Sequence, residues 1–424
     1  MKPRKNHITI FEHQSIRQGD TFKGCDFDDS ILKSLQAHFG TKGVPYYSLI
    51  HKGVKFNEYV GVIQVGKTTI EVLPKADNRD SDHQELKWRK ILIGMLRAVN
   101  SIELESTSNS NLRIKPNSIL DLYFELLVIE IEHLLHNGLL KQYRKKESNL
   151  NALIGRINFS KNIQKNLIHK ERFYVNHTVY DQNHKLHQIL YKAILILKQI
   201  NTNIELQSRI GTLLLNFPKM PDIKISESLF EKINFNRKNT PYKKAIDIAK
   251  MILLQYHPDL LHGRNHILAI MFNMNLLWER FVYHSLKSNP EQGTVVKKQN
   301  QKSFWIAEDK SEVKVKPDII FSKNSNQFVL DTKWKILKGG NPSVEDLRQM
   351  YVYHEYYNAK KVALVYPADY ELSGKVWAGK YIDHTSQKVS NKECSNLFIS
   401  SEENIAEWQK NIYLNISKWS VSNE

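Results

Sequence analysis

The chain has 424 residues, more than one hydrophobic core usually contains, so two or three domains are expected. Hydrophobic residues make up 41% and charged residues 25%, which excludes both a disordered chain and a membrane protein. The formal net charge of +17 attracts polyanions, and nucleic acid is the obvious partner, although a Lys-rich genome composition would produce the same charge.

A cytoplasmic location without a membrane partner is expected. No run approaches the roughly 20 apolar residues that a membrane-spanning helix needs, and the start, MKPRKNHITIFEH, lacks the apolar segment of a secretory signal. The two cysteines, Cys25 and Cys394, are too few for a zinc cluster or a disulfide framework, and we assign them no role.

Residues 1–116 are predicted to form a β-rich N-terminal domain. The expected elements are a strand at 8–13, a helix at 28–39, strands between 47 and 74, and a helix at 84–99. Side chains alternate from Tyr59 to Val65, and Gly66-Lys67 then turns the chain into a second strand, which predicts a hairpin. The polar stretch 106–111 marks a candidate domain boundary.

The segment from Gly61 to Thr68 fits the phosphate-binding pattern GxxxxGK[ST] letter for letter. A P-loop needs a glycine-rich loop followed by a helix whose N-terminus faces the phosphate. Here the loop would be VIQV, and the TTIEVLP that follows favours a strand ending at Pro74. We therefore interpret Gly66 and Lys67 as turn residues. A P-loop NTPase acting through Lys67 and Thr68 is the alternative.

Residues 117–262 are predicted to be a helical middle region. The expected helices cover 118 to about 143, 184–200, 204–215 and 242–255. The first helix would end in a basic run, which we interpret as a solvated C-terminal turn: Lys141, Arg144, Lys145 and Lys146. A second basic group surrounds Phe173 and Tyr174 and would suit either DNA phosphates or plain solvent: Lys161, Lys165, Lys170 and Arg172.

Residues 263–424 are predicted to form an α/β domain around a central sheet. A helix at 268–286 precedes strands at 295–298, 304–307, 317–321 and 328–333; a helix at 343–357, strands at 362–366 and 397–400 and a terminal helix follow. Mixed strands between helices are typical of a sheet covered by helices. The whole chain is therefore expected to be a multi-domain protein of mixed α/β (α+β) class.

The passage VKPDIIFSKNSNQFVLDTKWK contains the residues that indicate chemistry. Asp318 and Asp331 lie in two strand-like segments separated by the polar turn SKNSNQ, so a hairpin would present both carboxylates. Lys333 lies two positions after Asp331, on the same face of its strand. The apolar segments IIF and FVL place these charges at the edge of a core, where unpaired charges are costly.

Two carboxylates and an amine suit phosphodiester hydrolysis. Hard oxygen ligands hold Mg²⁺, which stabilises charge on phosphoryl oxygens and activates water. Asp318 and Asp331 are the expected metal ligands, with the carbonyl of Thr332 as a third. Lys333 would orient or deprotonate the attacking water. A solvated Asp and Lys on a surface hairpin is the alternative.

Two further side chains are candidates for the same catalytic centre. Glu279 is a charge within the apolar helical segment LLWERFV, just before the expected sheet, although it could instead pair with Arg280 or Lys287. Gln349 and Tyr353 are four residues apart and share one face of the helix at 343–357, although the tyrosine could belong to the core.

These segments resemble the McrC family, the nuclease subunits of McrBC-type restriction systems. The resemblance covers most of the chain, through GVIQVGKTTIEVLPK near the start and LIGRINFSKNI and HTVYDQNHKLHQIL in the middle. Its most specific part is the series LLWERFV, KPDIIF, LDTKWK and QMYVY, in that order. The Walker-like string then corresponds to a hairpin of the family.

The resemblance implies a PD-(D/E)xK restriction-endonuclease-like domain that cuts DNA with Mg²⁺ in a type IV, 5-methylcytosine-dependent system for defence against foreign DNA. It implies a partner, a hexameric ring of an McrB-like AAA+ GTPase, which itself binds GTP and recognises the modified base. The N-terminal domain is then expected to be an adaptor that docks in the ring and stimulates GTP hydrolysis. A non-cleaving adaptor between the GTPase and DNA is the second alternative.

Overall fold

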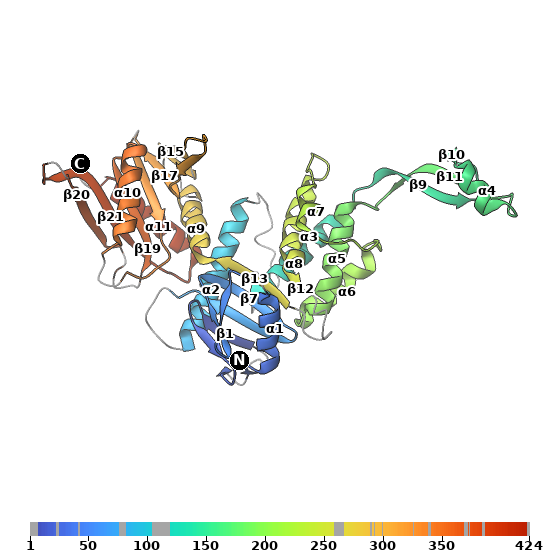
Figure 1. Ribbon diagram of the computed structural model, residues 1–424, viewed down its shortest axis with the longest axis horizontal. Helices are drawn as coiled ribbons and strands as arrows, with labels where there is room; N and C mark the ends of the chain where they lie inside the picture. Colours follow the sequence, from blue (N-terminus) through green and yellow to red (C-terminus); the bar gives the residue numbers. More distant parts are fainter. Residues whose placement is uncertain are drawn as a thin grey trace. The chain divides into compact units, whose positions relative to one another are not determined.

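The computed structural model describes residues 7–22, 25–40, 43–75, 82–103, 119–257, 267–288, 291, 293–298, 300–324, 326–337, 341–368, 372, 374–383 and 386–421. They form a mixed α/β structure with several sheets, which confirms the expected fold class. Unit 1 consists of Met1–Asn111 with Met271–Glu424, and unit 2 of Leu112–Ile270 (Figure 1). The division into three domains stays a prediction.

The N-terminal part of unit 1 is built on a hairpin. Strand β7 (Tyr59–Val65) pairs antiparallel with β8 (Thr68–Leu73), and β8 pairs parallel with β1 (His7–Phe11). Gly66 in the turn has φ 57°, a backbone conformation that glycine adopts without strain. The hairpin prediction is therefore confirmed. Residues 68–73 continue as a strand, and the helix that a P-loop needs after its lysine is absent there.

Two helices and five short strands complete this part. Helix α1 (Asp29–Phe39), expected from the sequence at 28–39, begins where the Asp28 side chain accepts a hydrogen bond from the Ile31 amide. Helix α2 covers Asp82–Glu103. The strands are β2 (Ser15–Arg17), β3 (Thr21–Phe22), β4 (Cys25–Asp26), β5 (Tyr47–Ile50) and β6 (Gly53–Phe56).

The C-terminal part of unit 1 contains a six-stranded mixed sheet in the order β14-β17-β18-β19-β21-β20. Its strands are β14 (Thr294–Lys298), β17 (Ile319–Lys323), β18 (Asn326–Thr332), β19 (Lys361–Ala368), β20 (Val376–Ile382) and β21 (Val389–Ser400). The central pairs β18/β19 and β19/β21 are parallel, and the other pairs are antiparallel. A separate hairpin is formed by β15 (Lys302–Ile306) and β16 (Glu312–Val315).

Helices cover both faces of this sheet. On one face, Phe328 of β18 meets Trp419 of α11 (Ile405–Val421), and Trp408 of α11 stacks on Trp278 of α9 (Met274–Ser288). On the other face, Val329 belongs to a buried cluster with residues of α10 (Val344–Tyr356). Because side chains alternate along a strand, Asp331 lies on the α10 face with Val329.

Unit 2 combines a helical region with a long arm, defined here as residues 142–181 (Figure 1). The helices are α3 (Ile119–His136), α5 (Lys185–Ile200), α6 (Ile204–Asn216), α7 (Glu227–Glu231), the 3-10 helix η1 (Thr240–Tyr242) and α8 (Lys243–Leu254). The arm consists of β9 (Gln142–Leu150), β10 (Arg156–Ile157), α4 (Phe159–Asn166) and β11 (Phe173–Asp181). Strands β12 (Tyr256–His257) and β13 (Ile267–Asn273) follow.

Three expectations about these elements were wrong. Helix α3 ends at His136 rather than near residue 143, because the chain turns at Gly138 with φ 83°. The basic run around Arg144 therefore lies at and within strand β9, not in a helical turn. Residues 268–273 form strand β13, and α9 begins only at Met274, where the Asn273 side chain accepts from the Leu276 amide.

Some elements of the structure were not predicted from the sequence. The strands of the arm and β20 were not predicted, since their largely exposed residues show no apolar alternation. The candidate boundary at 106–111 lies outside the described residues. Among the helices that the structure describes, none is long and apolar enough to cross a membrane.

Candidate active site

The two strand-borne aspartates meet across the β17/β18 pair. Ile319 pairs with Leu330 in the antiparallel register. Asp318 directly precedes Ile319 and Asp331 directly follows Leu330, so the two aspartates lie level on neighbouring strands. The hairpin geometry expected from the sequence is therefore present.

Asp318 is held by the residue that follows Asp331. Its Oδ2 accepts hydrogen bonds from the Thr332 amide at 2.7 Å and from the Thr332 hydroxyl at 2.8 Å. Two donors on one carboxylate oxygen stabilise its charged form and restrict its rotation. Thr332 thus orients one of the expected metal ligands.

Lys333 closes the centre on the same face of the strand end. Its ammonium lies 2.8 Å from Asp331 Oδ2 and donates to Gln349 Oε1 at 3.1 Å. Its amide donates to the Val365 carbonyl of β19 at 3.0 Å. The structure therefore brings together five of the predicted site residues, namely Asp318, Asp331, Thr332, Lys333 and Gln349.

Helix α10 supplies Gln349 from the opposite side of the centre. The helix begins where the Ser343 hydroxyl accepts from the Asp346 amide at 3.1 Å. Gln349 Nε2 donates to the Tyr353 hydroxyl at 2.9 Å, which in turn donates to the Lys316 carbonyl at 2.9 Å. This chain of hydrogen bonds ties α10 to the residue two positions before Asp318. The predicted shared face of Gln349 and Tyr353 is confirmed.

Asp346 and Lys335 belong to the same charge network but were missed in the sequence. Asp346 Oδ1 lies 3.6 Å from the Lys333 ammonium, and its Oδ2 lies 2.6 Å from the Lys335 ammonium. An acid in the first turn of a helix usually needs no other explanation. The available signal was the alternation of Lys333 with Lys335, which places both amines on one face.

Burial and neighbouring charges perturb the acid–base equilibria of the centre. Burial, together with the charge of Asp318, raises the pKa of Asp331 to about 7, against the opposing effect of Lys333. Burial works to lower the pKa of Lys333, but the carboxylates of Asp331, Asp346 and Asp318 outweigh it and raise that pKa above its ordinary value. The neutral form of Asp331 and the charged form of Lys333 are therefore both favoured relative to the isolated side chains.

The donor set fits a magnesium ion with few protein ligands. In the described part of the chain, no group of three or more His, Cys, Asp or Glu side chains is arranged to hold a metal. Asp318 and Asp331 offer hard oxygens, and Mg²⁺ keeps several waters when one or two carboxylates bind it. The charge of Asp318 disfavours ionisation of Asp331, and a bound divalent cation would offset that repulsion.

Glu279 lies on α9, which packs on the other face of the sheet. Its side chain is buried, with 6% exposed. The neighbouring Trp278 donates to the Val365 carbonyl at 3.2 Å, the same oxygen that accepts from the Lys333 amide. The helix turn that carries Glu279 is therefore anchored beside the strand end that carries Lys333, and the role of Glu279 in the centre stays a prediction.

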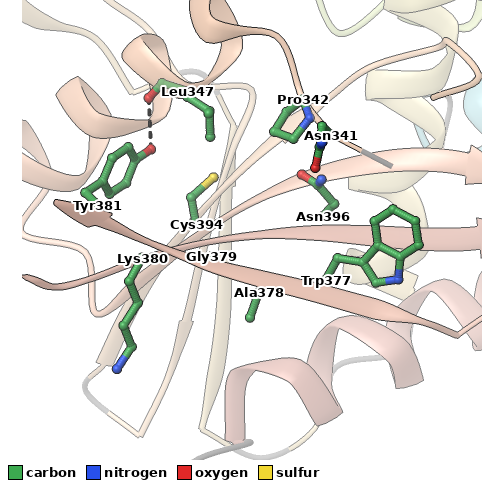
Figure 2. A pocket seen from close by; sticks show the side chains of 10 residues that line it. All are labelled: Asn341, Pro342, Leu347, Trp377, Ala378, Gly379, Lys380, Tyr381, Cys394 and Asn396. Atoms are coloured by element: carbon green, nitrogen blue, oxygen red, sulfur yellow. Dashed lines mark hydrogen bonds between the residues drawn. The ribbon is translucent and has the colours of Figure 1, made fainter. Parts of the chain in front are cut away.

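A cavity of about 270 Å³ is lined by residues at the N-terminus of α10 and by residues of β20 and β21. Leu347, which follows Asp346, lines it together with Trp377 and Cys394 (Figure 2). The Tyr381 hydroxyl closes one wall by donating to the Leu347 carbonyl at 2.8 Å. Burial raises the pKa of Cys394 to about 12, so its thiol stays protonated and is no nucleophile.

The fold and this centre define a multi-domain α/β protein with two aspartates and a lysine at the adjoining ends of two paired strands of the sheet. The chain belongs to the family of McrBC 5-methylcytosine restriction system components, whose model matches residues 54–367. The matched range includes both the β7/β8 hairpin and the Asp318, Asp331 and Lys333 centre. No curated protein sequence matches the chain.

One solved structure shares the fold of this chain. A chain in the half-complex of Thermococcus gammatolerans McrB AAA+ hexamers with bound McrC is 19% identical, with a TM-score of 0.68 over 98% of this chain and 100% of that chain. A chain in the cryo-EM structure of the Thermococcus gammatolerans McrBC complex is also 19% identical, with a TM-score of 0.46 over 66% of this chain and 87% of that chain. Of these two similarities, the one with a TM-score of 0.68 shows that the fold is shared.

Proposed function

We propose that the chain is the endonuclease subunit of a 5-methylcytosine-dependent restriction system and hydrolyses DNA phosphodiester bonds with Mg²⁺. The observation that carries the proposal is the convergence of Asp318, Asp331 and Lys333 at adjoining ends of β17 and β18. This is the PD-(D/E)xK arrangement, with Pro317-Asp318 as its first element and Asp331-Thr332-Lys333 as its second. The family membership and the net charge of +17 support DNA as the substrate.

Each residue of the centre has its own role in the proposed hydrolysis. Asp318, Asp331 and the Thr332 carbonyl would hold Mg²⁺, which when bound supplies charge stabilisation at the phosphate and a more acidic water. Lys333 offsets negative charge near the phosphate and orients the attacking water, because Asp331 and Gln349 fix its ammonium at 2.8 and 3.1 Å. The Lys335–Asp346 pair keeps Asp346 engaged beside Lys333.

Glu279 is proposed as an additional acidic residue of the centre. Its helix is tied to the catalytic strand end through Trp278 and the Val365 carbonyl. The Glu279 side chain is buried in the helix turn that Trp278 anchors. The position of Glu279 relative to the metal is part of this proposal.

The family and the fold of the chain also support a protein partner. The Thermococcus gammatolerans structure that shares the fold contains McrB AAA+ hexamers with bound McrC. We infer that this chain, acting in the cytoplasm, binds an McrB-like hexameric ring that carries the GTP. Its N-terminal part would dock in the ring and stimulate GTP hydrolysis.

Plasmid cleavage by the complex with Mg²⁺ and GTP tests the proposed function. Asp331→Asn and Lys333→Ala should abolish cleavage of methylated plasmid and leave stimulation of the partner's GTPase intact. Glu407→Gln and Lys410→Ala on exposed positions of α11 are matched controls and should cleave normally. Cleavage by the Asp331→Asn variant at the wild-type rate would refute the proposed nuclease function. Wild-type protein that stimulates GTP hydrolysis but never cuts would instead be the non-cleaving adaptor.

A further inference from the structure

A buried carboxylate outside the catalytic centre connects the N-terminal sheet to the strand end that carries Lys333. Glu12 follows β1, and its amide continues the strand pairing by donating to the Leu73 carbonyl at 2.9 Å. Its side chain is buried. Its Oε1 accepts from the Trp334 indole Nε1 at 2.8 Å and from the Lys75 amide at 2.9 Å.

The cost of burying Glu12 calls for an explanation. Burial raises its pKa to about 7, against the hydrogen bonds from Lys75 and Trp334, which lower it. The second oxygen, Oε2, is buried without a hydrogen-bond partner in the described structure. A half-satisfied acid destabilises a fold relative to an apolar residue of similar volume. The hydrogen bond from the Trp334 indole is the contact that links buried Glu12 to the strand end carrying Lys333.

Trp334 is the residue next to Lys333 and joins three elements. Its indole meets Trp88 of α2 edge-on at a centroid distance of 6.2 Å and Trp278 of α9 at 5.5 Å. Its amide donates to Asn275 Oδ1 at 3.3 Å. The indole is 8% exposed, so Glu12 binds a side chain that is already packed on two helices.

The geometry points to a specific role: we propose that Glu12 is a positioning residue that fixes Trp334, and thereby holds the adjoining Lys333 against Asp331 and Gln349. The inference rests on the proposed nuclease function. Strand β18 ends at Thr332, so Lys333 lies just beyond the regular strand. Lys333 and Trp334 share a peptide bond, so an indole held by Glu12 and by two helices restrains the backbone from which the Lys333 side chain extends.

A consequence is that the N-terminal sheet is part of the nuclease centre. Glu12 and Trp334 are separated by 322 positions in the chain, yet both belong to unit 1. If the N-terminal part were only a docking module, the position of the Lys333 side chain would not depend on β1. Here the strand end that carries Lys333 depends on an acid that directly follows the first strand.

Three variants of the full chain, assayed in the complex with the GTPase ring, test the role. Glu12→Ala should lower kcat for plasmid cleavage at least tenfold with an unchanged KM for DNA and unchanged GTPase stimulation. Glu12→Gln keeps an acceptor for the indole N–H and should restore kcat to within about threefold of the wild type. Trp334→Phe removes the donor and should match Glu12→Ala, with no further loss in the double variant.

Asp29→Ala, which removes an exposed acid of α1, is the matched control for the N-terminal part and should leave kcat unchanged. The indole N–H resonance of Trp334, assigned by its loss in Trp334→Phe, should shift in Glu12→Ala and stay near its wild-type position in Glu12→Gln. This readout reports the contact independently of cleavage.

The outcomes separate this inference from the proposed function. Wild-type cleavage by Glu12→Ala, with Asp331→Asn inactive, would overturn the positioning role and leave the nuclease standing. A Glu12→Gln variant as slow as Glu12→Ala would overturn it too, since charge and not the hydrogen bond would then matter. If Glu12→Ala does not fold, Trp334→Phe decides, because normal cleavage by that variant contradicts the role. Cleavage by Asp331→Asn would remove the proposed function itself.

Discussion

The Lys333 ammonium lies 2.8 Å from the Asp331 carboxylate, two positions back on the same strand end. Asp331 is 2% exposed, and its pKa is raised to about 7 by burial and by Asp318. The pair therefore combines a carboxylate that resists ionisation with an amine that supplies the compensating charge. A divalent cation would relieve the same repulsion between the two aspartates.

Asp318→Asn should lower cleavage by on the order of a hundredfold or more, because it replaces a charged hard-oxygen ligand with a neutral amide while keeping an oxygen that can accept from the two Thr332 donors. Mn²⁺ binding, followed by the loss of the free-ion electron paramagnetic resonance signal, should weaken in parallel. Unchanged Mn²⁺ affinity in Asp318→Asn would contradict its assignment as a ligand. Asp309→Asn, in the turn between β15 and β16, is the control.

Gln349→Ala should lower kcat for cleavage by roughly tenfold, because losing a hydrogen bond to the Lys333 ammonium is worth about 1.5 kcal/mol. The neighbouring Arg348 is exposed on the same helix, so Arg348→Ala is the matched control and should retain kcat. Equal rates for both variants would show that Gln349 does not hold Lys333.

The free energy of unfolding should depend on pH through Glu12. Its pKa is about 7 in the folded chain and near its ordinary value of 4.5 when unfolded, so protonation is favoured by folding. Its contribution is complete below pH 4.5 and is lost as pH rises through 7. The loss is on the order of 3 kcal/mol.

Glu12→Gln cannot ionise, so its stability relative to the wild type should increase between pH 5 and pH 8. Urea unfolding of unit 1, followed by tryptophan fluorescence at both pH values, measures this difference. A stability difference that is the same at pH 5 and pH 8 would show that Glu12 ionises normally in the folded chain.

Tyr242→Phe should lower the thermal stability of unit 2, at a cost of about 2 kcal/mol or more. The Tyr242 hydroxyl accepts from the Leu140 amide at 2.8 Å and donates to His187 Nε2 at 2.9 Å, while His187 Nδ1 donates to the Gln182 carbonyl at 2.5 Å. Removing the hydroxyl leaves a donor and an acceptor unpaired where the arm joins the helices.

Scanning calorimetry of Tyr242→Phe measures this loss, and limited proteolysis should show earlier cleavage near the base of the arm. Tyr191→Phe, which leaves that hydrogen-bond chain intact, is the control. Burial lowers the pKa of His187, which agrees with a neutral ring that accepts at Nε2. An unchanged melting temperature in Tyr242→Phe would contradict the role of this chain.

Short-range patterns predicted much of the structure. The Gly66-Lys67 hairpin and the helix starts at Asp28 and Ser343 follow from turn and capping chemistry, which acts over about four residues. The same range covers Asp331 and Lys333, whose shared face follows from strand alternation. The arm was missed because its strands are solvated on most of their surface, so apolar periodicity is absent.

By itself the sequence determined the composition of the centre and its local geometry: two aspartates on a hairpin, a lysine two residues on, and a helix carrying Gln349. Only the tertiary structure decided that Asp346 and Lys335 complete the charge network and that Glu12 reaches Trp334 across 322 positions. Neighbouring residues prescribe turns, caps and faces, because those depend on a few dihedral angles. Which distant side chains meet depends on how the packed elements bury their surfaces together, and no local pattern encodes that choice.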